Sequence, residues 1–142
     1  MSDLVFFYGT LMSRFRREER AELNVQLKMV AKGSIAAALF DLGPYPAAIP
    51  EPHSRVRGEL HKMLHVDRIL PVLDEIEGFM ADDRMASLYT REVTAVRRDD
   101  GPVVTAWVYF YNAPLGTAPR IASGDYLEYL DVRSRARAGG SA

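Results

Sequence analysis

Glu77 is the residue best suited to acid–base chemistry, because it lies on the apolar side of a predicted helix. On a helical wheel at about 100° per residue, it projects between the apolar Leu70 and Leu73. Asp74 and Glu75 fall outside this apolar stripe. Partial burial, the nearby Asp74 charge and the negative end of the helix dipole all disfavour ionised Glu77, so we predict a raised pKa. A carboxyl group tuned toward neutrality can take up a proton and return it, as general acid–base catalysis requires.

Two structural roles for Glu77 remain open at this stage. The carboxylate could pair with a buried arginine such as Arg91, or the stem could lie on apolar surface while the carboxylate reaches solvent. The catalytic interpretation therefore needs a second feature that would hold a substrate.

Such a feature is the turn formed by Tyr8, Gly9, Thr10 and Leu11, which follows the apolar run 4–7. A buried strand that ends at glycine lets the backbone turn sharply and present successive N–H groups. These groups would bind carboxylate or carbonyl oxygens without a basic side chain. Ordinary turn chemistry is the alternative, since Gly-Thr is common at strand ends.

The elements that must position these residues indicate an α+β fold with a mixed, curled sheet. Apolar or alternating runs predict strands over residues 4–7, 35–42 and 56–64, and a hairpin over 89–96 and 103–111. The charged segment 14–27 favours a surface helix.

The helix that carries Glu77 is predicted over residues 67–77. Asp67 offers an N-cap, Pro71 lies near the first turn, and Gly78 provides a C-terminal stop. The expected buried stripe consists of Ile69, Leu70, Val72, Leu73 and Ile76.

Composition excludes several classes of function. The 142 residues suit a single domain, expected over 1–132, followed by a disordered basic tail over 133–142. A net charge of −1 supplies no field to attract nucleic acid or an anionic membrane. The absence of cysteine removes thiolate nucleophiles and sulfur metal sites, and it fits a reducing compartment. No export signal or membrane span is visible, so a cytoplasmic protein with a small-molecule partner is expected.

A series of short segments, in order and spacing, resembles the γ-glutamylcyclotransferase-like family, also called the AIG2-like or butirosin-cyclotransferase-like group. The resemblance extends from Leu4 to Tyr129. It rests on the apolar strand into residues 8–11 and on segments 43–47, 56–60, 73–79, 89–91, 106–109 and 123–126.

This resemblance implies a small barrel-like mixed sheet with peripheral helices and a reaction that releases 5-oxoproline from γ-glutamyl amides. The substrate's own α-amine attacks its γ-carbonyl, with a glutamate matching Glu77 as the general acid/base. No metal or cofactor is implied. The implied substrate contacts are Tyr8, Gly9, Thr10, Leu11, Tyr45 and Tyr89.

Two other functions for the same pocket remain open: a non-catalytic module that binds a small metabolite, and an amidohydrolase in which Glu77 activates water. The connection 79–88, which contains Asp82 and Asp83, is longer than the family pattern suggests. It is expected to be a solvated loop. If it instead covers the pocket, its acids would favour a cationic leaving group.

Overall fold

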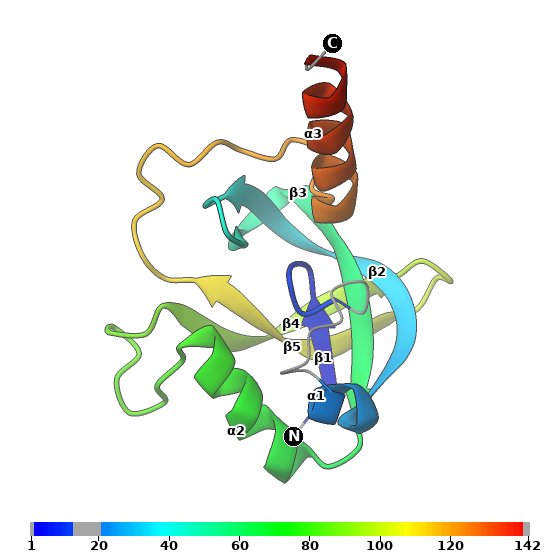
Figure 1. The fold of residues 1–142 in the computed structure, drawn as a ribbon. Coiled ribbons are helices and arrows are strands. Elements are labelled where there is room, and N and C mark those ends of the chain that lie inside the picture. Colours follow the sequence, from blue (N-terminus) through cyan, green and yellow to red (C-terminus); the bar gives the residue numbers. More distant parts are fainter. Residues whose placement is uncertain (1, 13–20, 141–142) are drawn as a thin grey trace.

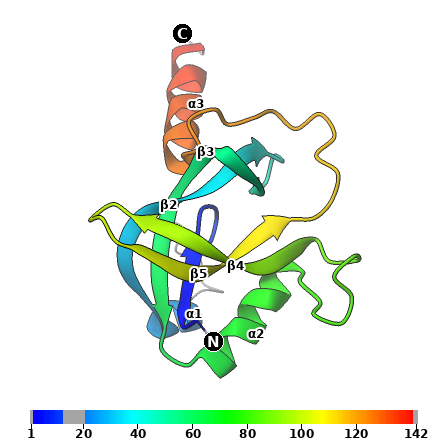
Figure 2. The same ribbon diagram turned by 180° about the vertical axis from the view of Figure 1, so that it is seen from behind.

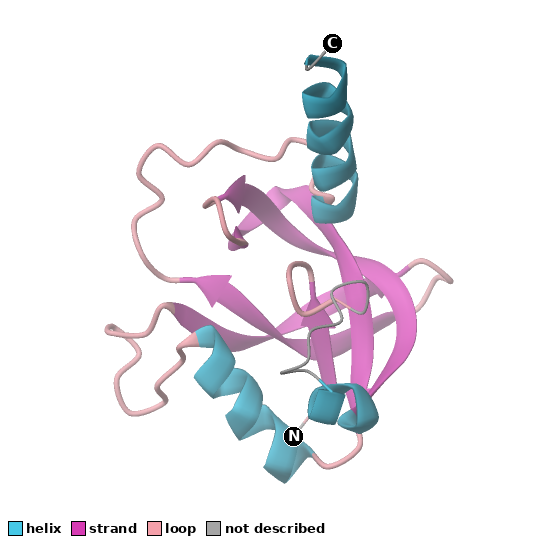
Figure 3. Ribbon diagram, viewed as in Figure 1, coloured by secondary structure: helices cyan, strands magenta, loops and turns pink. Residues whose placement is uncertain are grey.

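A closed barrel of five strands forms the centre of the molecule (Figures 1 and 3). The computed structural model describes residues 2–12 and 21–140. The strands follow the order β1-β3-β2-β4-β5, and β1 is parallel to β5 while every other neighbouring pair is antiparallel. The predicted mixed, barrel-like sheet is therefore confirmed. The bounds are β1 Leu4–Phe7, β2 Leu27–Asp41, β3 Pro46–Met63, β4 Tyr89–Arg98 and β5 Val103–Tyr111.

Three helices among the described residues lie outside the barrel, and they are α1 Ala21–Gln26, α2 Val66–Glu77 and α3 Tyr126–Gly140. Figures 1 and 2 show α1 and α2 at one end of the barrel and α3 projecting from the other. The helix expected over 14–27 is described only from residue 21, and Leu27 already belongs to β2. Across residues 2–12 and 21–140, no helix is long and apolar enough to cross a membrane.

All five strands supply apolar side chains to one core. Phe6, Ile35, Leu60, Val96 and Val108, one from each strand, are at most 1% exposed. Strand β1 pairs on both sides and is buried along most of its length, which explains its wholly apolar sequence. The cavity described below is therefore bounded by a strand that is paired on both sides.

Strand β2 begins at Leu27 rather than at residue 35, and β3 begins at Pro46 rather than at residue 56, so both are longer than predicted. Beyond the barrel, the end of β2 and the start of β3 form a two-stranded arm. Residues 46–50 of β3 pair with β2 alone, so this part of β3 is an edge strand. An edge strand tolerates proline, which cannot donate to a neighbouring strand. Proline residues at 46, 50 and 52 are therefore compatible with this strand.

The C-terminal segment differs from the expectation of a disordered tail after residue 132. Helix α3 passes through this point and continues to Gly140. Its first turns are fixed to β2, because the Tyr129 hydroxyl donates to Asp41 Oδ2 over 2.6 Å and Arg133 Nη1 donates to the same oxygen over 3.1 Å. Alanine and arginine, which recur after this point, are good helix formers.

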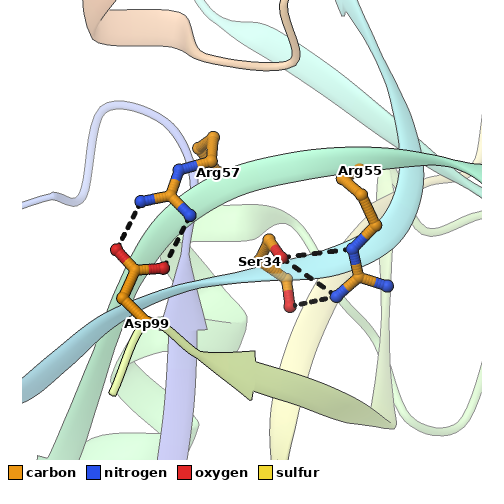
Figure 4. A network of polar contacts seen from close by, with 4 residues as sticks. All are labelled: Ser34, Arg55, Arg57 and Asp99. Atoms are coloured by element: carbon orange, nitrogen blue, oxygen red, sulfur yellow. Dashed lines mark hydrogen bonds and ion pairs between the residues drawn. The ribbon is translucent and has the colours of Figure 1, made fainter. Parts of the chain in front are cut away.

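The outer face of the barrel carries a polar network that joins β2, β3 and the β4–β5 turn (Figure 4). Arg57 forms a two-point contact with Asp99, from Nη1 to Oδ1 over 2.7 Å and from Nη2 to Oδ2 over 2.5 Å. Arg55 Nη2 donates to the Ser34 carbonyl over 2.8 Å. Hydrogen bonding from Arg57 holds the pKa of Asp99 below its usual value.

Replacing Asp99 by asparagine is expected to have a small effect on stability. Both partners are about two-fifths exposed, so solvent screens the ion pair. We expect Asp99→Asn to lower the free energy of unfolding by less than about 1 kcal/mol, measured by urea denaturation. A loss above about 2 kcal/mol would show that this contact stabilises the closed barrel far more than an exposed pair normally does.

Candidate active site

A cavity of about 220 Å³ opens between the end of β1, the start of β3, the end of α2 and the β4–β5 hairpin. It is smaller than the ~300–1,000 Å³ of pockets that bury drug-sized ligands. It brings together every residue to which a catalytic or substrate-binding role was assigned from the sequence: Tyr8, Gly9, Thr10, Leu11, Tyr45, Glu77 and Tyr89. The remaining lining residues are Phe6, Phe7, Pro46, Ile76, Leu88 and Tyr109.

Helix α2 directs Glu77 into this cavity. Its buried residues Ile69, Leu70 and Leu73 pack against the barrel, and Glu77 follows Leu73 by one helical turn. Gly78 ends the helix in the left-handed conformation, with φ of 68°.

The sequence analysis placed the limits of the α2 stripe incorrectly. Val72 and Ile76 are 41% and 50% exposed, so the buried stripe is narrower than the wheel suggested. The N-cap is His65 rather than Asp67, which lies in the first turn.

The predicted rise in the pKa of Glu77 is confirmed, and burial is its cause. Desolvation raises this pKa to about 7. No side chain in the described part of the chain donates a hydrogen bond to the Glu77 carboxyl group. The expected contribution from Asp74 is not found, because that carboxylate is neutralised by other groups.

Asp74 is the partner of the buried arginine that the sequence analysis considered for Glu77. Arg91 Nε lies 3.1 Å from Asp74 Oδ1, and the Tyr109 hydroxyl donates to the same oxygen over 2.7 Å. The Arg91 guanidinium also lies over the rings of Trp107 and Phe79, at 4.5 Å and 5.4 Å from their centroids. Glu77 is thus left without a cationic partner in the described residues.

Three buried phenols surround Glu77, and each hydroxyl proton is already committed. Tyr8 donates to the Tyr109 carbonyl over 2.6 Å, and Tyr89 donates to the Pro46 carbonyl over 2.9 Å. Burial, together with the nearby Glu77 charge, raises the pKa of Tyr8 and of Tyr89. The pKa of Tyr109 is raised by burial and by its hydrogen bond to Asp74. These phenols therefore shape the cavity rather than exchange protons at neutral pH.

Tyr109 is a lining residue to which no substrate contact was assigned from the sequence. Its position could have been found from the hairpin register. Tyr89 pairs directly with Tyr111, and Tyr109 lies two residues before Tyr111, so all three side chains share one face of the hairpin. Pro46, Ile76 and Leu88 carried no comparable signal.

The turn after β1 forms one wall of the cavity. The Met12 N–H donates to the Gly9 carbonyl over 3.0 Å and closes the turn. Gly9 does not adopt a positive φ, so this turn does not depend on the left-handed conformation that glycine permits. Glycine is required here because a Cβ at this position would lie 2.8 Å from Pro46 Cγ. None of the described residues accepts a hydrogen bond from the N–H of Thr10 or Leu11, which can therefore bind a ligand.

Replacing Gly9 by alanine is expected to displace the turn rather than unfold the protein. The added methyl group must move away from the Pro46 ring, and the neighbouring N–H groups move with it. We expect kcat/KM to fall by about tenfold, because misplaced binding groups lose part of their alignment with the reacting atoms. Steady-state kinetics measure this change, and a variant with wild-type kcat/KM would show that the turn does not contact the substrate.

The connection 79–88 does not place its acidic residues at the cavity. Asp83 Oδ1 accepts a hydrogen bond from the Ala86 N–H over 3.2 Å, and Ser87 Oγ accepts one from the Met80 N–H over 2.7 Å. Only Leu88 of this connection lines the cavity. The structure therefore gives Asp82 and Asp83 no part in selecting a cationic leaving group.

No metal site is evident in the portion of the chain that the structure describes, which holds no cluster of three or more His, Cys, Asp or Glu residues suited to a cation. His61 Nε2 lies 2.9 Å from Glu59 Oε1, and His65 Nδ1 lies 2.8 Å from Gln26 Oε1.

Comparisons with known proteins show the family and the fold of this chain. A family model described as "Gamma-glutamyl cyclotransferase, AIG2-like" matches residues 5–128. A comparison with curated proteins gives no match.

Several solved structures share the fold. The protein ytfP from Escherichia coli has 26% sequence identity and a TM-score of 0.64, over 89% of this chain and 97% of that one. An AIG2-like protein from Mus musculus has 22% identity and a TM-score of 0.65, over 87% of each chain. YkqA from Bacillus subtilis has 22% identity and a TM-score of 0.69 over 95% of this chain. The chain spans less than half of the length of YkqA, 43%.

Proposed function

The chain belongs to the gamma-glutamyl cyclotransferase, AIG2-like family, and on this premise we propose that it releases 5-oxoproline and an amine from a γ-glutamyl amide. One observation carries the proposal. The carboxyl group of Glu77 lines a small cavity beside the β1 turn, and burial raises its pKa to about 7. A group with this pKa is ionised in part of the molecules at neutral pH and can act as base and then as acid.

The proposed reaction is intramolecular. The α-amine nitrogen of the substrate attacks its own γ-carbonyl carbon, so that the ring C–N bond forms as the amide C–N bond breaks. Because the nucleophile is tethered, the protein contributes mainly by holding the substrate in a bent conformer. The cavity is small enough to enforce such a conformer on a γ-glutamyl group.

Glu77 transfers the proton that this reaction must move. Its carboxylate takes a proton from the substrate's α-ammonium group and gives it to the departing nitrogen, which leaves as a neutral amine. The α nitrogen loses a second proton when it becomes the ring amide, and this proton is released to solvent. No other carboxyl, imidazole or amine side chain of the described residues lines the cavity, so this role falls to Glu77.

The β1 turn supplies groups for the substrate's oxygens. The N–H groups of Thr10 and Leu11 can donate to the α-carboxylate or to the oxyanion of the tetrahedral intermediate. This proposal is supported by the lack of any lysine or arginine among the lining residues that the structure describes.

Aromatic walls disfavour the alternative hydrolytic reaction. The rings of Tyr45 and Tyr89 lie 6.2 Å apart, and Tyr89 contacts Tyr111 at 5.3 Å between centroids. The rings of Tyr45 and Tyr89, with the apolar Phe6 and Leu11, give the cavity walls that offer an attacking water molecule few hydrogen-bond partners.

Product analysis tests the proposal. The protein is incubated with a panel of γ-glutamyl amides, and 5-oxoproline and free glutamate are quantified. We expect 5-oxoproline at a rate above that of the Glu77→Gln variant, which controls for spontaneous cyclisation. Free glutamate would indicate hydrolysis, and an unchanged but bound ligand would indicate a binding module. The cytoplasmic location and the independence from metals and cofactors stay predictions.

A further inference from the structure

The cavity has a buried floor and an exposed apolar mouth. The floor includes Tyr8, Tyr89 and Tyr109, which are 7%, 5% and 3% exposed. Ile76 and Leu88 also line the cavity but are 50% and 39% exposed, so they lie where it opens to solvent. Ile76 and Leu88 are the most exposed of the lining residues, so a group that extends outward on this side of the cavity contacts these two aliphatic side chains.

Both residues of the mouth are fixed next to Glu77. Ile76 precedes it in α2. The Leu88 N–H donates to the Gly78 carbonyl over 2.9 Å, and a Cβ built on Gly78 would lie 3.2 Å from Leu88 Cβ. The departing nitrogen, which must reach the Glu77 carboxyl group, therefore leaves between Ile76 and Leu88.

Asp74 and Arg84, two charged residues near this mouth, are already paired. Asp74 is held by Arg91 and Tyr109. The Arg84 guanidinium lies 5.7 Å from the Phe79 centroid and 3.3 Å from Glu92 Oε1. Of the residues that the structure places around the cavity, Glu77 alone carries a carboxyl, amine, guanidinium or imidazole group. A charged leaving group would lose hydration here without gaining a partner of opposite charge.

We propose that the leaving amine carries an uncharged apolar substituent, alkyl or aryl, which packs against Ile76 and Leu88. This inference rests on the proposed function, since it concerns the amine that the cyclisation releases. The γ-glutamyl group fills the floor, the amide nitrogen lies at Glu77, and the substituent covers the two exposed aliphatic side chains. Burial of apolar surface then favours alkyl and aryl amines over ammonium or carboxylate-bearing ones.

Three substrates of matched length test this selectivity. They are the γ-glutamyl amides of butylamine, of 1,4-diaminobutane and of 4-aminobutanoate, which differ in ending as a methyl, an ammonium or a carboxylate group. We expect kcat/KM for 5-oxoproline release to be at least about tenfold higher for the butylamide than for either charged substrate. Equal or higher values for a charged substrate would overturn the inference and leave the proposed function intact. No 5-oxoproline from any of the three would overturn both.

Two variants on one face of α2 test whether the mouth formed by Ile76 and Leu88 causes the preference for an uncharged substituent. Ile76→Asp is expected to lower the ratio of butylamide to diaminobutane-amide kcat/KM by at least about tenfold, because it places an anion beside the substituent. Val72→Asp is the matched control: Val72 lies one turn earlier, is 41% exposed and does not line the cavity. It should keep the wild-type ratio. Because each ratio is taken within one variant, a general loss of activity cancels. An unchanged ratio in Ile76→Asp, or equal changes in both variants, would overturn the assignment.

Discussion

Replacement of Glu77 by glutamine is expected to lower kcat/KM for 5-oxoproline release by at least about 10²-fold. Glutamine fills the same space at the end of α2 but cannot take a proton from the substrate's α-ammonium group. The phenols that surround the site cannot substitute, because their protons are held by the Tyr109 and Pro46 carbonyls and by Asp74. Initial rates over a range of concentrations of one γ-glutamyl amide measure kcat/KM, and circular dichroism checks that the variant is folded.

Glu75→Gln is the matched control for this experiment. Glu75 lies two residues earlier in α2 and is exposed, so the same chemical change should leave the rate within a few-fold of the wild type. A Glu77→Gln variant that also stayed within a few-fold would show that Glu77 is not the general base.

The pH dependence of the wild-type enzyme gives an independent check on Glu77. Burial raises the pKa of this carboxyl group from 4.5 to about 7, and the free enzyme needs the ionised form to accept a proton. We expect kcat/KM to fall about tenfold per pH unit below about pH 7 and to level off above it. A limb with its midpoint near pH 4.5 would contradict a buried base.

Local sequence patterns were sufficient to place Glu77 on the apolar side of α2 but not to predict its electrostatic surroundings. The wheel worked because Leu73 and Leu70 precede Glu77 by four and seven residues, so all three lie on one face of one helix. The pairing of Asp74 with Arg91 joins α2 to β4, and no periodicity within either element reveals it. The direction of the shift in the pKa of Glu77 was therefore predicted correctly, but part of the shift was assigned to Asp74, whose charge is neutralised by Arg91.

The same division applies to the fold. The hairpin of β4 and β5 was predicted because alternation and the intervening turn are local signals. The β3 half of the arm was not predicted, since its prolines are acceptable only on an edge that the topology creates. The continuation of α3 past residue 132 was not predicted either, because a long-range contact from Tyr129 and Arg133 to Asp41 fixes the first turns of this helix. Ile76 and Leu88 share a mouth only once α2 and the following loop have folded against each other.

The residue that is proposed to catalyse the reaction should also destabilise the fold above neutral pH. In the unfolded chain a glutamate has a pKa of 4.5, whereas burial raises that of Glu77 to about 7. Between these values the folded state binds more protons than the unfolded state, so the stability contributed by this group falls as pH rises. Glutamine stays neutral throughout and avoids the loss.

At about pH 8, the free energy of unfolding of Glu77→Gln is therefore expected to exceed that of the wild type by on the order of 1–3 kcal/mol. The lower end of this range is favoured because the Glu77 side chain is partly exposed to solvent. The advantage should shrink toward about pH 4, where both side chains are neutral. Urea denaturation at a series of pH values measures it, and Glu75→Gln should keep the pH dependence of the wild type. A constant difference between Glu77→Gln and the wild type across this range would mean that Glu77 is not desolvated in the folded protein. Such a group would have an ordinary pKa, and its suitability as a proton carrier at neutral pH would be lost with it.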